Sequence, residues 1–261
     1  MHSRTKEGSR HVDAALRTLD ILDCFLAEPR LSLGQIIAKT GLVRSRVMRL
    51  LGTLEHRGYI IEDAATRTYS LGCRLAGLGK SFDRANNTET LVRPVLNYLV
   101  DKTGESATFY VADGVERVAL VRQEGTKAIR LSIVEGQRTP LHAGASGKVL
   151  LAFGDPATLN KILQSKVLTR ITDQTVTDPD SLAHELRTVR DQGYAVSKGE
   201  NIPDSYAIAT PVFNYENRLV GAVGIAGPAG RLAEDEIKSR IELVLHAARV
   251  LSRRYGCKME S

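Results

Sequence analysis

Arg44, Ser45, Arg46 and Arg49 lie within six consecutive positions and have side chains that suit contact with nucleic acid. Arginine binds phosphates and can donate two parallel hydrogen bonds to the edge of a guanine, and serine donates to phosphates or bases. The apolar residues of this region recur at helical spacing: Val47, Leu50, Leu51 and Leu54. The pattern predicts a helix that buries this stripe and turns Ser45, Arg46 and Arg49 outward.

The residues before this helix predict a shorter helix and a tight turn. Ser32 is placed to cap the shorter helix, and Gln35 completes the pattern of a capping box. We expect that helix to end near Thr40, because Gly41 can adopt the left-handed conformation that redirects the chain. Two helices joined in this way form a helix-turn-helix, in which the N-terminal half of the second helix enters the major groove.

The flanking segments predict a winged form of this motif. Val12 to Ala27 can form a helix with enough apolar surface to close a three-helix core, using Ala15, Leu16, Leu19, Ile21, Leu22 and Phe25. After the motif, Tyr59–Ile61 and Thr68–Leu71 are short strand-like runs separated by a polar turn. We therefore predict an all-α winged helix-turn-helix domain over residues 1–71. Its candidate DNA contacts are Ser32, Arg44, Ser45, Arg46, Arg49 and Arg67.

The charge of the chain is unevenly distributed. Residues 1–86 contain 14 Lys and Arg against 9 Asp and Glu, whereas the rest of the 261 residues contain 22 against 21. A basic excess attracts the phosphate backbone of DNA, so its coincidence with the motif favours double-stranded DNA as the partner. A helical hairpin with a basic face is also common in soluble proteins, and a motif that contacts protein instead is the alternative.

Cysteine usage and hydropathy predict a cytoplasmic protein. Cys24, Cys73 and Cys257 are odd in number and lack the spacing of a zinc site or a redox motif, so we expect free thiols in a reducing compartment. The N-terminal MHSRTKEGSRH has no apolar core for a signal peptide, and no apolar run is long enough to span a membrane.

Residues 72–88 are expected to form a linker helix, with Leu75, Leu78 and Phe82 at helical spacing. Its apolar stripe can pack on its own domain or against the same helix of a second subunit. A homodimer is favoured, because one short reading helix specifies too few base pairs and a second half-site doubles the readout.

Residues 89–256 show the mixed pattern of an α+β domain. Three strand-like runs, SATFYVADG, ERVALVRQEG and KAIRLSIVEG, each end in glycine and predict an antiparallel meander. Two later strands, YAIATPVFN and RLVGAVGIAG, flank a turn. Helices are expected over residues 92–102 and 233–254, and from Gly147 and Asp178 onward.

The segment LHAGASGKVLLAF contains a small-residue loop that enters a helix near Ala145. It is not a phosphate-binding loop of the nucleotide-binding type, because His142 and Val149 occupy the places of the required glycine and hydroxyl residue. The free backbone N–H groups at the start of the helix favour an anion such as a carboxylate. An enzyme that uses this loop as an anion cradle is a further alternative, although no nucleophile and base lie at a recognisable spacing.

The ordered set GLVRSRVMRLLGTLE, GYI, YSLG, LHAGASGKVLLA, GYAVSKGE, AIATPVF and VGAVGIAGPAGRL resembles the IclR family of bacterial transcriptional regulators over nearly the whole chain. The resemblance implies a winged helix-turn-helix, a GAF-like or profilin-like effector-binding domain, and a dimer or a dimer of dimers. It implies no enzyme activity, cofactor or metal. The family's effector-lining positions match Ala128, Leu131, Thr139, Ala145, Ser146, Ser197, Ser205, Ala207, Gly224 and Ala226.

The chain departs from the family pattern in this expected pocket. Family members that bind small oxo-acids tend to have an acidic residue at Ser197, a cysteine at Ala207, and serines at Gly224 and Ala226. Smaller, less polar residues here suggest a larger or more apolar ligand, such as an aromatic acid. The sequence thus predicts a transcription factor, a repressor or an activator, whose DNA binding is controlled by a small-molecule effector.

Overall fold

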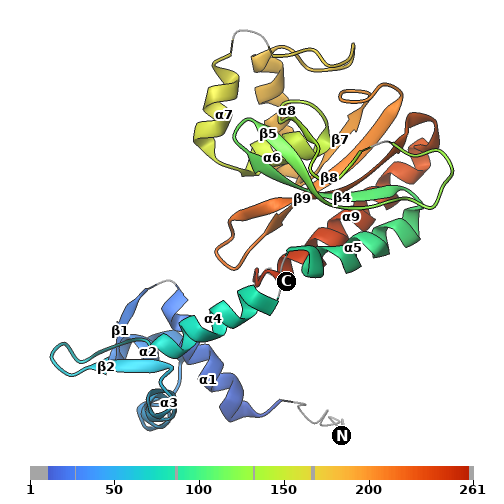
Figure 1. Cartoon of the computed structure of the whole chain (residues 1–261). Coiled ribbons are helices and arrows are strands. Elements are labelled where there is room, and N and C mark those ends of the chain that lie inside the picture. The colour runs from blue at the N-terminus through green and yellow to red at the C-terminus, as the bar shows by residue number, and fades with distance from the viewer. Residues whose placement is uncertain (1–10, 27, 86–87, 132, 166–167, 259–261) are drawn as a thin grey trace, which may run out of the picture. The chain divides into compact units, whose positions relative to one another are not determined.

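The computed structural model of the protein describes residues 11–26, 28–85, 88–131, 133–165 and 168–258. The chain divides into two compact units, Met1–Ala85 and Asn86–Ser261 (Figure 1). Residues 1–10, on which the expected lack of a signal peptide depends, lie outside the described residues. Among the helices in the described ranges, none is long and apolar enough to cross a membrane.

The first unit contains three helices that share one core: α1 (Asp13–Asp23), α2 (Leu33–Thr40) and α3 (Arg44–His56). The buried core side chains are Ile21, Phe25, Leu31, Ile36, Val47, Leu51, Leu54 and Ile60. The predicted contribution of α1 is wrong in part, since Leu16 and Leu19 are 43% and 57% exposed. At 3.6 residues per turn these two leucines lie on the side of the helix opposite Ile21, which faces the core.

The turn between α2 and α3 has the predicted local structure. Ser32 Oγ accepts a hydrogen bond from the backbone N–H of Gln35, and the Gln35 side chain accepts one from the Ser32 N–H at 2.8 Å. This reciprocal pair is the predicted capping box. Gly41 ends α2 with a φ of +67°, a conformation that side chains other than glycine rarely adopt. The motif is therefore defined by contacts local in sequence.

A small sheet that includes the predicted wing completes the first unit, so the winged helix-turn-helix is confirmed as helices plus a small sheet. The predicted wing consists of β2 (Ile60–Asp63) and β3 (Thr68–Leu71), paired antiparallel. A third strand, β1 (Arg30–Ser32), pairs antiparallel with the other edge of β3. Three residues are too few for a period-two pattern to show in the sequence, so β1 was not predicted.

The helix α4 (Cys73–Ala85) follows the wing and corresponds to the predicted linker helix. Leu78 is 52% exposed and Leu75 is half-buried. The side chain of Phe82, the third residue of the predicted stripe, lies outside what the structure describes. Part of the apolar face of α4 is thus uncovered within the described chain.

The second unit is built on a six-stranded antiparallel sheet in the order β6-β5-β4-β9-β8-β7. Its strands are β4 (Ser106–Asp113), β5 (Glu116–Gln123), β6 (Arg138–Pro140), β7 (Ala195–Lys198), β8 (Ser205–Phe213) and β9 (Leu219–Pro228). The central pair, β4 and β9, joins strands more than 100 residues apart in sequence. The α+β class expected for this part of the chain is confirmed.

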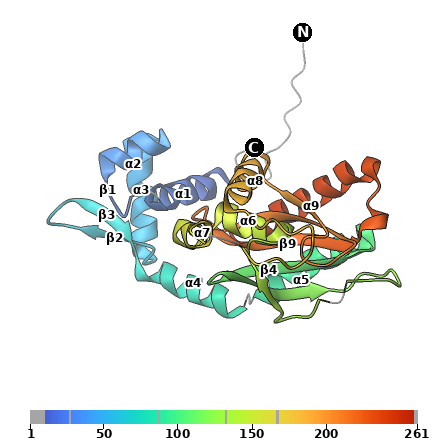
Figure 2. The ribbon, with the colours of Figure 1, turned by 90° about the horizontal axis from the view of Figure 1, so that it is seen from above.

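Helices cover both faces of this sheet (Figures 1 and 2). The helices α5 (Thr88–Thr103) and α9 (Glu234–Arg254) pack together on one face, where large side chains such as Ile208 and Ile225 form the core. The helices α6 (Ala145–Phe153), α7 (Pro156–Leu163) and α8 (Pro179–Gln192) cover the other face. That face carries small residues, including Ala207, Ala209 and Gly224, which leave room beneath α6.

The strand expected over residues 127–136 does not form. The described part of this segment is irregular, with Ile129 and Val134 70% and 63% exposed. Leu131 and Ile133 instead line a cavity. The apolar residues alternate because the segment covers this cavity with one side, and not because it pairs with another strand. The edge position beside β5 belongs to β6, and two further elements, β7 and α7, were not predicted.

Candidate functional site

The first candidate site is the exposed face of α3. The side chains of Arg44, Ser45 and Arg49 are exposed and form no hydrogen bond or ion pair among the described residues. Val43 caps α3 without a side-chain hydrogen bond, so the first N–H groups of the helix remain free. Free amides and unpaired guanidinium groups at one helix start can bind phosphate and base edges.

Arg46 differs from its neighbours because it has a fixed partner. Its Nη2 donates to Asp13 Oδ2 on α1, and this hydrogen bond lowers the pKa of the Asp13 carboxyl below its usual value. The Arg46 side chain is still 35% exposed. The contact therefore restricts the orientation of one predicted DNA-reading side chain without burying it.

The wing presents Arg67 in a strained turn. Arg67 has a φ of +53°, and its N–H donates to the Asp63 carbonyl at 2.8 Å. Asp63 Oδ1 accepts a further hydrogen bond from Ala65 N at 3.0 Å, which fixes the turn. The guanidinium is exposed and unpaired within the described chain, so it is available to a phosphate.

Sequence reasoning missed two apolar residues on the same face as the arginines. Val43 is 69% exposed and Met48 is 52% exposed. Met48 lies one turn after Arg44, and this helical spacing is the signal that could have identified it. An exposed apolar side chain on a reading helix can contact the methyl group of thymine.

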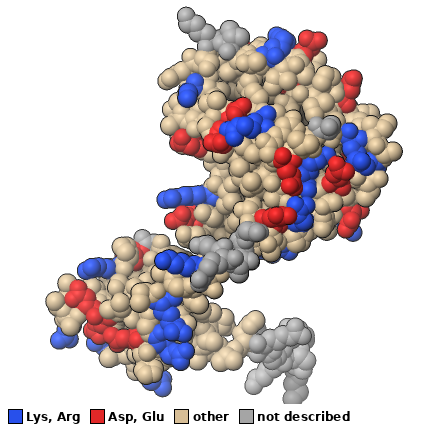
Figure 3. Space-filling model, in the orientation of Figure 1, with Lys and Arg blue, Asp and Glu red and all other residues tan. Residues whose placement is uncertain are grey.

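The distribution of charged side chains differs between the two units. On the face drawn in Figure 3, the first unit carries basic side chains around a smaller acidic group, whereas basic and acidic side chains are interspersed over the second unit. This view agrees with the basic excess counted in residues 1–86. The electrostatic attraction for DNA therefore belongs to the first unit.

The second candidate site is a cavity between the sheet and the start of α6. Eight of the ten predicted effector residues are among those that line it: Leu131, Ala145, Ser146, Ser197, Ser205, Ala207, Gly224 and Ala226. Ala128 and Thr139 are not part of this lining; Ala128 lies in the irregular segment, and Thr139 pairs with Arg117 across β6 and β5. Residues distant in sequence thus meet around one space.

The start of α6 has the features that the sequence predicted for an anion. Gly144 precedes the helix with a φ of +82°, and no side chain caps the first turn. Ala145 and Ser146 lie in that turn and in the cavity lining. Their uncapped N–H groups and the helix dipole favour a negatively charged group there.

The lysine of the GASGK loop does not point to a ligand. Lys148 is 4% exposed, and its Nζ lies 2.6 Å from Glu200 Oε1 and 2.5 Å from Glu185 Oε2. Glu200 Oε2 also accepts a hydrogen bond from Gly144 N at 3.1 Å. Since two carboxylates neutralise Lys148, it stabilises the loop and is unavailable to a phosphate.

A charged residue that sequence reasoning missed, Arg117, lies in the cavity wall. It is 5% exposed, its Nη1 donates to the Ala143 carbonyl, and its guanidinium carbon lies 5.4 Å from the centre of the Tyr110 ring. Burial lowers the pKa of Arg117, and the negative charge of Glu200 opposes that effect. The sequence did contain a signal for it. Arg117 lies two positions before Ala119 on the same strand, and residues two apart on a strand point to the same face, which here is buried.

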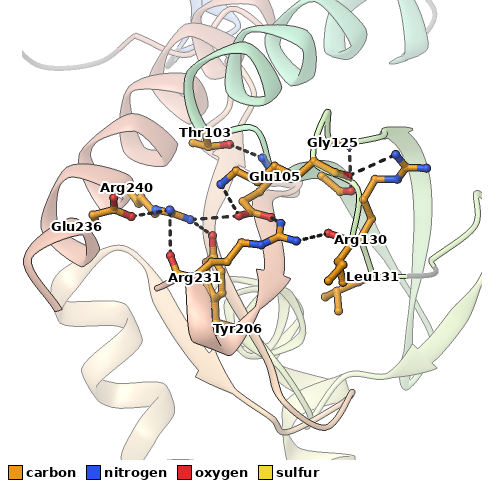
Figure 4. A network of polar contacts seen from close by, with 12 residues as sticks. Thr103, Glu105, Gly125, Arg130, Leu131, Tyr206, Arg231, Glu236 and Arg240 are labelled. Atoms are coloured by element: carbon orange, nitrogen blue, oxygen red, sulfur yellow. Dashed lines mark hydrogen bonds and ion pairs between the residues drawn. The ribbon is translucent and has the colours of Figure 1, made fainter. Parts of the chain in front are cut away.

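Polar contacts hold the irregular segment over the cavity (Figure 4). Arg231 Nη2 donates to the Ile129 carbonyl at 2.6 Å, and its Nη1 donates to buried Glu105 at 3.2 Å. Glu105 also binds Lys127 Nζ at 2.9 Å. Arg122 Nη2 donates to the Leu131 carbonyl at 2.8 Å. Side-chain contacts therefore replace the strand pairing that this segment lacks.

Comparison with known families decides between the alternatives. Residues 14–64 match the IclR helix-turn-helix domain, and residues 84–253 match the bacterial transcriptional regulator IclR C-terminal domain. The chain belongs to the IclR family. It is a DNA-binding transcriptional regulator with a C-terminal effector-binding domain, and the family is one of regulators and not of enzymes.

Relatives of this IclR-family regulator share its full organisation. The HTH-type transcriptional regulator BhcR of Paracoccus denitrificans is 33% identical over 246 residues, which cover 94% of this chain and 88% of BhcR. The HTH-type transcriptional regulator KipR of Bacillus subtilis is 30% identical over 241 residues, which cover 92% of this chain and 96% of KipR. The crystal structure of Thermotoga maritima IclR has a TM-score of 0.62 at 28% identity, covering 94% of this chain and all of that one.

The IclR-family regulator shows no cluster of three or more His, Cys, Asp or Glu residues able to hold a metal within its described part. Cys24, Cys73 and Cys257 are free thiols. The polar groups of the two candidate sites are amide, hydroxyl and guanidinium groups, which bind anions by hydrogen bonding and charge.

Proposed function

We propose that a small carboxylate binds in the cavity of the effector domain and changes the affinity of the winged helix-turn-helix for its operator. The observation that carries this proposal is the uncapped first turn of α6, which opens onto a cavity lined by small and apolar residues. A carboxylate accepts hydrogen bonds from such amides, and the apolar walls suit its carbon skeleton.

The size of the cavity favours a compact acid. The cavity has a volume of about 40 Å³. One water needs roughly 10–15 Å³ of such volume, so the space suits a ligand of a few heavy atoms. An aromatic acid, which the sequence suggested, needs more space than this volume provides.

The proposed DNA-binding residues are Ser32, Arg44, Ser45, Arg46, Arg49 and Arg67, and the proposed effector residues are the eight predicted residues of the cavity lining. Ser32 acts through its cap at the start of α2, whose first-turn N–H groups can meet a phosphate. The arginines and Ser45 supply base and phosphate contacts.

A homodimer is the proposed reading form. Leu16 and Leu19 on α1 and Leu78 on α4 leave apolar surface exposed in the single chain. Pairing through this surface gives two reading helices and hence two half-sites. Sedimentation of Leu78→Glu is expected to show a monomer where the wild type is a dimer, with weakened binding to a two-half-site duplex. A wild-type monomer contradicts this assembly.

The proposal is tested on a duplex selected from a random pool by the full-length protein. Its dissociation constant is measured with acetate, propionate or benzoate, each beside its amide. A change of severalfold or more with an acid, and none with its amide, supports carboxylate control of DNA binding. Because coupling is reciprocal, the duplex must alter the affinity for that acid by the same factor. DNA binding that no acid alters contradicts the proposal.

A further inference from the structure

Arg117 is a buried cation with an incomplete set of partners. Within the described residues, its Nε has no hydrogen-bond partner and the guanidinium forms no ion pair. Its Nη1 donates a hydrogen bond to the Ala143 carbonyl. Burying a charge without an opposite charge or enough hydrogen bonds is costly, so its place in the fold needs an explanation.

Two other buried cations of this domain have carboxylate partners, whereas the guanidinium of Arg122, also buried, bonds to Ser106 Oγ and the Leu131 carbonyl without an ion pair among the described residues. Lys148 has both Glu200 and Glu185, and Arg240 binds Glu236 at 2.6 Å. Glu200 is the acid whose charge acts on Arg117, but its two oxygens already bind Lys148 Nζ and Gly144 N. Arg117 therefore lacks a free carboxylate within its own chain as described.

The surroundings of Arg117 place its guanidinium at the uncapped start of α6. A Cβ added at Gly144 would lie 3.2 Å from Arg117 Nη2, and one added at Gly147 would lie 2.7 Å from Nη1. The two glycines thus give the guanidinium room against the first turn of the helix. The positive charge of the guanidinium and the positive end of the α6 dipole therefore lie together in the cavity wall, and both attract an anion.

Among the described residues, the lining of the cavity contains no carboxylate that balances this positive charge. Its described lining contains Arg117 and polar but uncharged residues such as Thr108, Ser146, Ser197 and Asn201, with no Asp or Glu. The Tyr110 ring lies against the guanidinium, whose carbon is 5.4 Å from the ring centre. An anion bound at this point would supply the charged partner that Arg117 lacks among the described residues.

We infer that Arg117 determines ligand specificity in the proposed effector site: its guanidinium binds the anionic group of the ligand beside the α6 amides, so an acid binds and its neutral amide does not. This inference rests on the proposed function and assigns the charge selection to a residue of β5. It places the anionic end of the ligand at Gly144–Ser146 and the carbon skeleton toward Ala207 and Gly224.

The test combines two measurements on the full-length protein. Crystals of the wild type are soaked in bromide, and an anomalous peak is expected beside Arg117 and the first turn of α6. Calorimetric titration then compares acetate with acetamide and benzoate with benzamide on the wild type, Arg117→Met and Arg117→Lys. Arg117→Met is expected to weaken acid binding about tenfold or more, while Arg117→Lys keeps part of the preference for acids.

Arg190→Met is the matched control. Arg190 Nε also donates to a backbone carbonyl, that of Ala152 on α6, but Arg190 is outside the cavity lining. Acid affinity should remain within about twofold of wild type in this variant.

The outcomes separate this inference from the proposed function. Acids that bind Arg117→Met as well as wild type overturn the role of Arg117 and leave carboxylate control intact. Bromide at Arg117 without binding of any acid supports the anion site and contradicts the carboxylate ligand. No bromide peak at Arg117 overturns the inference even if Arg117→Met fails to fold, because that measurement uses the wild type.

Discussion

Glu200 binds both the side chain of Lys148 and the backbone N–H of Gly144, the residue immediately before α6. One of its oxygens lies 2.6 Å from Lys148 Nζ, and the other accepts a hydrogen bond from Gly144 N at 3.1 Å. Both side chains are buried, with 5% and 8% of their surface exposed. A single carboxylate therefore fixes the helix and the glycine from which the proposed anion site begins.

Glu200→Gln is expected to reduce the free energy of unfolding by about 3 kcal/mol, because buried Lys148 then keeps only the more exposed carboxylate of Glu185 as a charged partner among the described residues. Urea denaturation monitored by circular dichroism measures this loss. Glu185→Gln is the matched control: its side chain is 41% exposed, so the loss should stay below about 1 kcal/mol. Equal losses in the two variants would contradict the central role of Glu200.

The sequence predicted the parts of the fold that depend on neighbouring residues. Ser32, Gln35 and Gly41 act within one helix and its ends, so their pattern was sufficient to place α2 and the turn. The partners of Lys148 lie 37 and 52 positions away, and no local pattern connects them. The segment with Leu131 and Ile133 was mistaken for a strand because lining a cavity and facing a sheet core produce the same alternation.

Arg46→Ala is expected to weaken binding to the selected duplex by about 10- to 100-fold, since a direct contact to a base is worth roughly 1–3 kcal/mol. Fluorescence anisotropy on selected and unrelated duplexes measures affinity and specificity together. Asp13→Ala should produce a smaller loss, because it releases Arg46 from its partner but keeps the guanidinium.

Arg17→Ala provides the control for the Arg46 experiment. Arg17 Nε lies 3.3 Å from Asp13 Oδ1, so this variant also removes an ion pair of Asp13, but the change is on α1. Its affinity for the selected duplex should match the wild type. A loss equal to that of Arg46→Ala would show that α1, and not the reading helix, is the sensitive element.

Arg67→Asn separates the backbone of the wing from its charge. Asparagine tolerates the left-handed conformation that Arg67 adopts, so the turn should remain folded. Loss of one phosphate contact should weaken all duplexes alike and reduce the slope of log affinity against log salt by about one. The slope is measured over about a sixfold range of salt concentration. An unchanged slope would show that Arg67 does not contact a phosphate.

Arg117 shows why the ligand site was predicted less completely than the DNA-binding helix. Eight lining residues came from the resemblance to the family, but Arg117 lies on β5 and reaches the cavity only because β6, the Ala143–Gly144 loop and Tyr110 enclose it. Its buried position follows from pairing between strands. A charged residue that the sequence suggests is on the surface can therefore be recognised as part of a cavity only when the pairing of the strands is known.

The raised pKa of Tyr206 leads us to expect that the protein loses stability at alkaline pH. Burial, with the charge of Glu105 as a smaller cause, raises the pKa of Tyr206 to about 12, from 10.0 for an ordinary phenol. The folded state thus holds this proton more tightly than the unfolded state does. The stability it contributes is complete below pH 10 and is lost as the pH rises from 10 through 12.

Tyr206→Phe should therefore lose less stability than wild type between pH 9 and 12 in thermal denaturation scans, because phenylalanine has no proton to release. Arg240, whose Nη1 bonds to the Tyr206 hydroxyl, keeps its ion pair with Glu236 in this variant. Tyr215→Phe is the control, since Tyr215 is 62% exposed and should leave the alkaline profile of the wild type unchanged. Identical profiles for wild type and Tyr206→Phe would show that another group governs unfolding in alkali.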